Sequence, residues 1–357
     1  MEFFTAGKKG ECRSVKVLMI GPARSVHGGI SGVVNNYYEA GLDQKIDLSY
    51  IGTMKEGSKI TKLLCAGTAY VQFLLKVQSC DIVHVNVASD MSYIRKSFFI
   101  RAAKRAGKKI VIHQHGGDFE GYYASLPEKK KEKVKETLSM GDVFLVLAPN
   151  WKEFFGKLID DDKIIVFPDS ISIPENFRKE YGQKRILFLG RICKEKGVGE
   201  LLAAMEEVRK IYPECELCLG GIWEDKSLEE QVRRRGTGIK YLGWIAGEEK
   251  KRYLRECDIF VLPSYFEGQS VAILEAMAHS CAVAASDVGG IPQMIIDGET
   301  GVLFRPKDKE ALKAGLLRLL SDPSLCKKLG ANARCKVENE FSIETNMKEL
   351  IDIYGKI

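Results

Sequence analysis

Short apolar runs alternate with amphipathic segments along most of the chain. The first run, Val15 to Pro22, ends in glycine and proline, which is typical of a buried parallel strand. In the first half we expect further strands at residues 45–52, 81–87, 109–114, 142–148 and 163–167, and helices at 31–40, 60–77, 92–106 and 129–139. Strands that alternate with helices predict a parallel sheet with helices on both faces.

The alternation stops at residues 168–182, where two prolines and several polar residues show no sustained period, and it then starts again. In the second half we expect strands at residues 185–189, 216–219, 239–242, 259–263 and 282–286, and helices at 199–211, 228–235, 247–256 and 271–279. Two similar α/β halves that are joined once leave a cleft between the carboxyl ends of their strands. Sheets of this kind bind ligands in such a cleft.

The length of 357 residues also favours two domains, because single cores stop growing near about 250–300 residues. We place the domains at residues 1–170 and 184–340, with a linker at 171–183 and an amphipathic terminal helix at 341–357. The composition, 45% apolar and 29% charged, is ordinary for a soluble globular protein. No apolar run approaches the roughly 18 residues that a membrane-spanning helix needs. Met1–Ser14 also holds no apolar stretch that could serve as a signal sequence. We therefore expect a cytoplasmic protein.

All of the net charge of +6 lies in the first half of the chain. Residues 1–170 hold 25 basic and 19 acidic side chains, whereas residues 171–357 hold 29 of each. Such a half attracts an anionic lipid surface, a pyrophosphate or a nucleic acid, and a solvated face without a partner is the alternative. Because the basic residues are not interleaved with aromatic ones on a recognisable reading surface, we do not expect nucleic-acid binding.

Neither the cysteines nor the acidic clusters indicate a metal site. Most of the ten cysteines have apolar neighbours, as free buried thiols do; they are residues 12, 65, 80, 193, 215, 218, 257, 281, 326 and 335. Cys215 and Cys218 are expected on one strand, where their spacing sends the side chains to opposite faces, so we expect neither zinc nor a disulfide framework. The D-x-D at Asp160 to Asp162 is interpreted as a solvated turn.

A glycine-rich loop follows the first strand, where Gly28 and Gly29 open the expected helix. Glycines let backbone N–H groups approach a phosphate at a helix N-terminus, although a tight structural turn would show the same pattern. The second strand ends without the acidic residue that would hold a nicotinamide ribose, which argues against hydride transfer.

Two cations follow the first strand of the second half. Gly190 ends that strand, Arg191 comes next and Lys196 lies five residues further on. Arginine can contact two oxygens of a diphosphate while lysine acts as a point charge, so the two together can neutralise a leaving group without a metal. Two solvated loop charges are the alternative interpretation.

A third segment carries two glutamates eight residues apart, Glu267 and Glu275. Ser270 can cap the helix that starts at Val271, which leaves the amides of Gln269, Ser270 and Val271 pointing toward an anion. Carboxylates on either side of that anion can accept hydrogen bonds from the hydroxyls of two different sugars. The spacing alone also occurs by chance.

Five motifs recur here in the order found in one family: Gly190-Arg191, Lys196-Gly197, Glu267 to Glu275, Asp287 to Pro292 and Asp297 to Phe304. Together they resemble retaining glycosyltransferases of family four, in which the two glutamates form an E-x7-E motif. The resemblance implies the GT-B fold, an α/β fold with two Rossmann-like domains whose parallel sheets face each other across a cleft. It covers nearly the whole chain and is strongest from about residue 185 to 305.

The resemblance also implies roles for individual residues. Arg191 and Lys196 would hold the donor diphosphate, Glu275 the ribose, and Glu267 the transferred sugar. His115 matches the family's His-Gly step near the reacting carbon, where a strand-end histidine bonded to a backbone carbonyl is the alternative. By the same pattern, the loop at Gly28 and Gly29 would border the phosphate. The first domain would bind the acceptor and the second the donor, and the terminal helix would pack back on the first domain.

Two positions depart from the family pattern. Gln269-Ser270 stands where an apolar residue and Gly or Pro are frequent, and Pro168-Asp-Ser170 stands where Pro-Asn-Gly is common. The amide contacts should survive the first departure because they belong to the backbone, but the surface that selects the sugar should differ.

We therefore expect a retaining hexosyltransferase that needs neither metal nor cofactor. Its donor would be a nucleotide diphosphate sugar, UDP- or GDP-linked, and its acceptor a saccharide hydroxyl, lipid-linked, in bacterial surface-polysaccharide biosynthesis. The basic first half, including Lys129–Lys131 and residues 95–109, suits a lipid pyrophosphate and peripheral attachment to an anionic membrane surface at the inner face of the cell membrane. A GT-B sugar-nucleotide epimerase and a non-catalytic sugar-nucleotide-binding protein are the alternatives.

Overall fold

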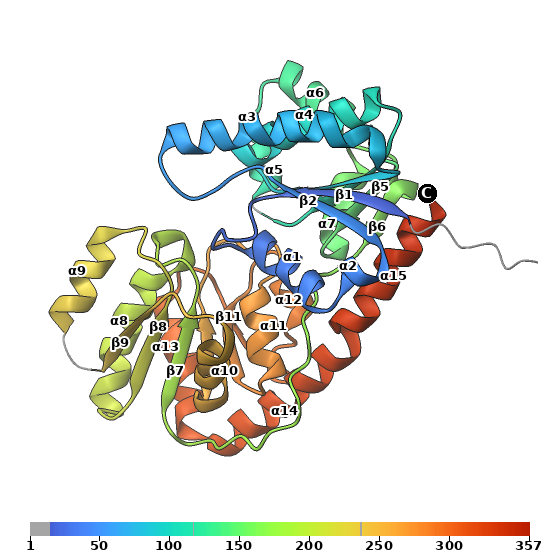
Figure 1. Ribbon diagram of the computed structural model, residues 1–357. Coiled ribbons are helices and arrows are strands. Elements are labelled where there is room, and N and C mark those ends of the chain that lie inside the picture. Colours follow the sequence, from blue (N-terminus) through green and yellow to red (C-terminus); the bar gives the residue numbers. More distant parts are fainter. Residues whose placement is uncertain (1–14, 117, 236–237) are drawn as a thin grey trace, which may run out of the picture.

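The computed structural model describes residues 15–116, 118–235 and 238–357, so the expectations for Met1–Ser14 and Cys12 concern residues outside this part. Two parallel six-stranded sheets, each packed against helices, form the two lobes of the molecule (Figure 1). This arrangement confirms the predicted α/β class with two Rossmann-like domains.

The N-terminal sheet has the strand order β2-β1-β3-β4-β5-β6. Its strands are β1 (Lys16–Gly21), β2 (Asp47–Gly52), β3 (Ile82–Val87), β4 (Lys109–Gln114), β5 (Val143–Val146) and β6 (Ile164–Val166). Its helical segments are α1 (Gly29–Glu39), α2 (Leu42–Lys45), α3 (Lys59–Lys76), η1 (Val77–Ser79), α4 (Asp90–Arg105), α5 (Phe119–Ser125), α6 (Glu128–Leu138), α7 (Pro149–Gly156) and η2 (Asp161–Lys163).

Alternate residues of the N-terminal strands pack on opposite faces of the sheet. Leu18 and Ile20 of β1 lie in a core formed with α3, α4 and α6, whereas Val17 lies in a core formed with α1 and α15. Because helices cover both faces, the central strands β1, β3, β4 and β5 are buried along nearly their whole length instead of alternating between buried and exposed residues.

The C-terminal sheet has the order β12-β11-β10-β7-β8-β9. Its strands are β7 (Arg185–Leu189), β8 (Glu216–Gly220), β9 (Ile239–Gly243), β10 (Ile259–Leu262), β11 (Ala282–Ser286) and β12 (Val302–Phe304). Its helical segments are η3 (Lys194–Lys196), α8 (Val198–Ile211), α9 (Lys226–Arg235), α10 (Gly247–Glu256), α11 (Val271–Ala278), α12 (Ile291–Met294), α13 (Lys309–Ser321) and α14 (Pro323–Glu340).

The last helix, α15 (Ile343–Lys356), returns to the N-terminal lobe (Figure 1). Asn346 connects it to that lobe, because its Oδ1 accepts from the Tyr37 hydroxyl at 3.0 Å and its Nδ2 donates to the Pro168 carbonyl at 2.8 Å. The Tyr354 hydroxyl lies 2.7 Å from His84 Nδ1 in the sheet. Side chains of α15 thus complete the core on one face of the N-terminal sheet.

One expectation about α3 is wrong. The helical segment from Lys59 to Ser79 is long and apolar enough to cross a membrane, by length and composition alone. The sequence analysis missed it because Lys62, a glycine, two threonines and two glutamines divide its apolar residues into short runs along the chain. On a helix these residues regroup onto faces, and most of them are not buried.

Candidate active site

Lys196 and Glu267 meet in the cleft between the two domains. Lys196 lies in η3, after β7, and Glu267 lies in the loop between β10 and α11. The Lys196 ammonium forms an ion pair with Glu267 Oε1, and the Ser264 hydroxyl donates to the same oxygen at 2.7 Å. Only 18% of the lysine side chain and 10% of the glutamate side chain are exposed, so solvent screens this pair little.

Gly289 orients the loop that carries Glu267. Its φ is +55°, and a Cβ there would lie 1.7 Å from the Glu267 carbonyl oxygen, so only glycine fits. The next residue, Gly290, donates its N–H to that carbonyl at 3.3 Å. These glycines belong to the Asp287 to Pro292 motif, for which sequence reasoning proposed no role.

Arg191 pairs with a different carboxylate from Lys196. Its Nη1 donates to Glu224 Oε2 at 2.9 Å, and about half of its side chain is exposed. The two cations that were predicted to share one diphosphate thus each pair with a different carboxylate. Sequence reasoning missed Glu224, because nothing in a spacing of 33 residues indicates the contact.

Helix α11 begins as the sequence predicts. Ser270 Oγ accepts from the Ile273 N–H at 3.4 Å, which confirms Ser270 as the N-cap and leaves the first amides of α11 for another acceptor. Glu275 lies in the second turn, where its Oε1 is 2.5 Å from Lys250 Nζ of α10. Lys250 is a second partner that sequence reasoning missed.

The two domains touch at Gly116 and Gly268. A Cβ on Gly268 would lie 2.8 Å from Gly116 Cα and 2.9 Å from the His115 carbonyl oxygen. One residue further on, Gln269 Oε1 accepts from the backbone N–H of Asp169 at 2.6 Å. Val271 packs against cores of both domains. The start of α11 is therefore in direct contact with the N-terminal domain.

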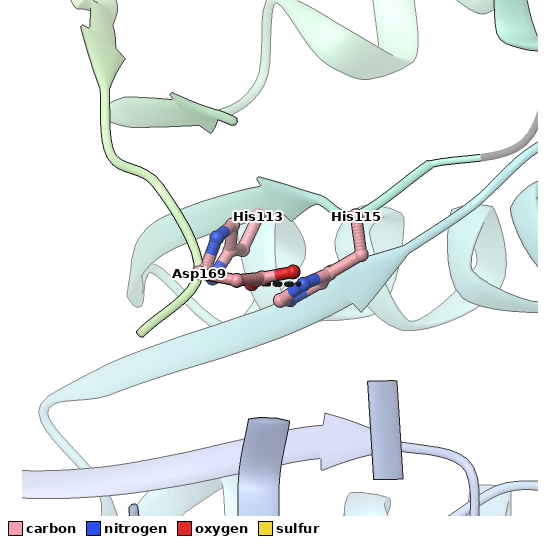
Figure 2. Close-up of side chains that lie close together, drawn as sticks. All are labelled: His113, His115 and Asp169. Atoms are coloured by element: carbon pink, nitrogen blue, oxygen red, sulfur yellow. Dashed lines mark hydrogen bonds and ion pairs between the residues drawn. The ribbon is translucent and has the colours of Figure 1, made fainter. Parts of the chain in front are cut away.

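His115 follows β4 and is turned into the protein (Figure 2). Its Nδ1 lies 3.2 Å from Asp169 Oδ1, and its Nε2 lies 2.7 Å from Asn86 Oδ1. Asn86 Nδ2 donates to the Ile20 carbonyl, which orients the amide oxygen toward the histidine. Both ring nitrogens thus contact side chains. Sequence reasoning had considered two other surroundings for His115, the reacting carbon of the substrate or a backbone carbonyl.

His113 stacks on His115 with 3.8 Å between the ring centroids. Burial holds its pKa well below the ordinary value, and burial also lowers the pKa of His84 on β3 to about 3. Ligand atoms of His113, His115 and Asp169 lie within 4.8 Å of one another, which is close enough for one metal ion (Figure 2). The Asp169 carboxylate already contacts His115, so this geometry supports a positioning role for Asp169.

A cavity of about 300 Å³ opens between the domains beside Glu267. Aromatic, acidic and amide side chains line this cavity: Asp118, Phe119, Glu120, Asn150, Trp151, Phe154, Phe155 and Phe266, together with Glu267 and Gly289. On the N-terminal side of this cavity, sequence reasoning named only His115, and on the C-terminal side it named Glu267. The signal was available, since residues 118–120 and 150–155 follow β4 and β5, whose carboxyl ends face the cleft.

The loop at Gly28 and Gly29 faces open space. A Cβ on either glycine would meet no atom within 4 Å, and Gly28 precedes the first turn of α1. Next to it, the His27 ring lies 4.3 Å from the Trp244 ring of the C-terminal domain, and His27 pairs with Glu56. Sterics within the protein therefore do not require glycine here.

The remaining candidates play no part in the cleft. Asp160 accepts from the Asp162 N–H inside η2, as expected of a solvated turn. The nine cysteines of the described residues are free thiols, Cys215 and Cys218 included. At the end of α11, burial lowers the pKa of His279 to about 4, and Lys179, Arg255 and Arg334 oppose its protonation.

Comparison with known proteins relates this chain to glycosyltransferases. Residues 169–336 match the family described as glycosyl transferases group 1. Alpha-maltose-1-phosphate synthase of Mycolicibacterium smegmatis is 34% identical over 187 residues, 48% of each chain. The amylovoran biosynthesis glycosyltransferase AmsK of Erwinia amylovora is 30% identical over 276 residues, 70% of this chain and 64% of that protein. The chain spans about half the length of the first curated relatives it matches.

Solved structures share the fold over nearly the whole chain. Sucrose-phosphate synthase from Thermosynechococcus elongatus is 20% identical, with a TM-score of 0.79 over 96% of this chain and 98% of that one. Anabaena HepE, solved with UDP and glucose, is 15% identical, with a TM-score of 0.75 over 96% and 100%. These likenesses confirm the GT-B fold.

Proposed function

We propose that this chain is a glycosyltransferase that moves a sugar from a nucleotide diphosphate donor to a hydroxyl of a saccharide acceptor. The observation that carries the proposal is the meeting of Lys196, Glu267 and the capped start of α11 on one wall of the cleft. This wall lies within residues 169–336, which match group 1 glycosyltransferases.

The donor would bind by replacing ion pairs of the free protein. A diphosphate oxygen can take the place of Glu224 on Arg191 and of Glu267 on Lys196, because charge-assisted hydrogen bonds to phosphate are as strong as those to a carboxylate. The released Glu267 carboxylate can then accept hydrogen bonds from sugar hydroxyls. Glu275 would contact the ribose after a similar exchange with Lys250.

Transfer would retain the anomeric configuration by displacement on one face. The acceptor oxygen bonds to the anomeric carbon as the bond to the diphosphate breaks, and the hydroxyl proton passes to the departing phosphate oxygen. Arg191, Lys196 and the α11 amides would stabilise the negative charge that develops on the diphosphate. These cations supply the stabilisation that a metal gives in other enzymes, and the nucleotide sugar, UDP- or GDP-linked, is a substrate and not a cofactor.

The cavity next to Glu267 suits the acceptor. The Trp151 and Phe266 side chains offer aromatic faces to a sugar ring, and Asp118 and Glu120 offer acceptors for its hydroxyls. A lipid-linked acceptor, a role in polysaccharide biosynthesis and a cytoplasmic site at the inner membrane face complete the proposal. The basic N-terminal half supports these points, as does a relative whose name places it in amylovoran biosynthesis.

Nucleotide binding and turnover test the proposal in sequence. UDP, GDP and a panel of their sugars are screened by thermal shift, since a ligand at 100 times its Kd stabilises by about 2.7 kcal/mol. Transfer is then assayed with the sugar that binds, and Arg191→Ala should lower turnover about 100-fold. Full activity in that folded variant would contradict the assignment, and product from donor without acceptor would indicate an epimerase instead.

A further inference from the structure

Helix α3 is apolar on the side that faces solvent. Six large side chains on it are 50–79% exposed: Ile60, Leu63, Leu64, Val71, Leu74 and Leu75. Their spacing places all six within one third of the helix circumference. The opposite side holds Ala69 and Phe73, which are buried in the N-terminal core. A helix at the surface of a soluble domain normally has a polar outer face.

Helix α4 extends this apolar surface. It packs beside α3, and the two helices lie across the face of the N-terminal sheet that points away from the C-terminal lobe (Figure 1). Met91, Ile94 and Phe98 of α4 are 61%, 41% and 59% exposed. We call these three residues and the six of α3 the apolar ridge. Apolar patches of this kind on a soluble protein mark an interaction site.

The charged side chains around the apolar ridge are mostly basic, although Asp90 starts α4 next to Met91. Residues 59–79 contain no aspartate or glutamate, and their three lysines, Lys59, Lys62 and Lys76, are all exposed near the two ends of α3. Exposed Lys104 and Arg105 end α4. An occupant of this surface must therefore offer apolar area together with negative charge, which an anionic lipid bilayer does and a second copy of this basic surface does not.

We propose that the apolar ridge docks the N-terminal domain on an anionic lipid bilayer. Because Ala69 and Phe73 hold α3 against the protein core, the helix lies in the plane of the interface and does not span it. The six outer side chains enter the boundary between headgroups and acyl chains, and the lysines at the helix ends contact lipid phosphates.

The starts of α3 and α4 bring one end of the ridge to the edge of the sheet that borders the cleft. In a parallel sheet each helix begins where the preceding strand ends, so α3 and α4 start at the carboxyl edge of the sheet, the edge that also carries Gly28 and His115. Ile60 and Met91, at the starts of these helices, are on the cleft side of the ridge. An acceptor sugar on a lipid could thus enter the cleft while its lipid stays in the bilayer.

Vesicle sedimentation tests the docking without requiring transfer. The full chain is incubated with phosphatidylcholine vesicles with or without phosphatidylglycerol. The variant Leu64→Gln/Val71→Gln/Leu75→Gln should lose about 100-fold or more in partition coefficient on anionic vesicles, because it removes three apolar side chains that enter the bilayer. The matched control is Ile211→Gln/Ile296→Gln, which alters two exposed isoleucines of the C-terminal domain and should bind as the wild type does.

Charge is tested separately with Lys59→Gln/Lys62→Gln/Lys76→Gln. This variant should lose the preference for phosphatidylglycerol and the salt sensitivity of binding. No binding by the wild type, or equal binding by the Leu64→Gln/Val71→Gln/Leu75→Gln variant, would overturn the inference. A wild-type dimer that this variant abolishes, with no vesicle binding, would show that the ridge contacts a second copy of the chain. UDP affinity is measured for every variant and should be unchanged. A failure of vesicle binding is then distinct from a failure of the proposed function.

Discussion

The Lys196 ammonium and the Glu267 carboxylate are paired in the cleft, although sequence reasoning assigned them to different parts of the donor. Each group neutralises the other, and Ser264 supports the carboxylate with a further hydrogen bond. Donor binding that separates the pair would produce a phosphate contact and a sugar contact together. The two residues should therefore act jointly on substrate affinity.

Lys196→Ala tests the phosphate contact. We expect kcat/KM to fall about 100-fold, because the departing diphosphate loses a preorganised cation, and we expect UDP affinity to fall as well. Both are measured by transfer kinetics and calorimetric titration with UDP. Lys194→Ala is the matched control, since Lys194 lies in the same turn and is exposed. An equal loss in both variants would mean that only the overall charge matters.

Gly268→Ala tests the contact between the domains. Its methyl group would lie 2.8 Å from Gly116 Cα, so one backbone has to move. We expect a loss of about 1–3 kcal/mol in unfolding free energy and lower turnover as the cleft is forced apart. Urea unfolding and transfer rates measure the two effects. Gly355→Ala, at a position in α15 where a Cβ would meet nothing within 4 Å, should leave turnover unchanged and should not lower the unfolding free energy. A stable, fully active Gly268→Ala variant would contradict the expectation.

The fold could be predicted well where an element is long or fully buried. The apolar runs of β1 and β4 and the amphipathic α8 are close to their expected bounds. β12 has only three residues, too few for a period to show, and α13 and α14 were given no separate prediction within the C-terminal domain. The outer face of α3 was missed because sequential hydropathy does not show which residues a helix brings together.

The site could be predicted as single residues but not as pairs. The motifs gave Lys196 and Glu267, and the capping of α11 by Ser270 followed from local rules. Contacts between side chains distant in sequence have no local signal. The two departures from the family pattern illustrate this, because Gln269 and Asp169 proved to contact each other across the domains.

Gly29→Ala tests whether the glycine loop borders a phosphate. A Cβ on Gly29 meets no protein atom within 4 Å, so the free energy of unfolding should change by less than about 0.5 kcal/mol. If the diphosphate lies against these amides, the methyl group displaces it and UDP affinity should fall about tenfold, the value of one charge-assisted hydrogen bond. Calorimetric titration with UDP measures the effect, and unchanged affinity would remove this loop from the donor site.

Stability should fall as the pH drops below 6.5, because His84, His113 and His279 are buried and neutral. Burial lowers the pKa of His84 to about 3 and that of His279 to about 4, and it holds the pKa of His113 well below its ordinary value. Between these values and about 6.5 the unfolded chain binds protons that the folded chain does not, so each histidine costs about 1.6 kcal/mol between pH 6.5 and pH 5. Urea unfolding at pH 7.5, 6 and 5 measures the slope, to which each histidine contributes up to about 1.4 kcal/mol per pH unit. His279→Gln should remove about one third of it, and equal unfolding free energies at the highest and lowest pH would show that these rings are protonated in the folded protein.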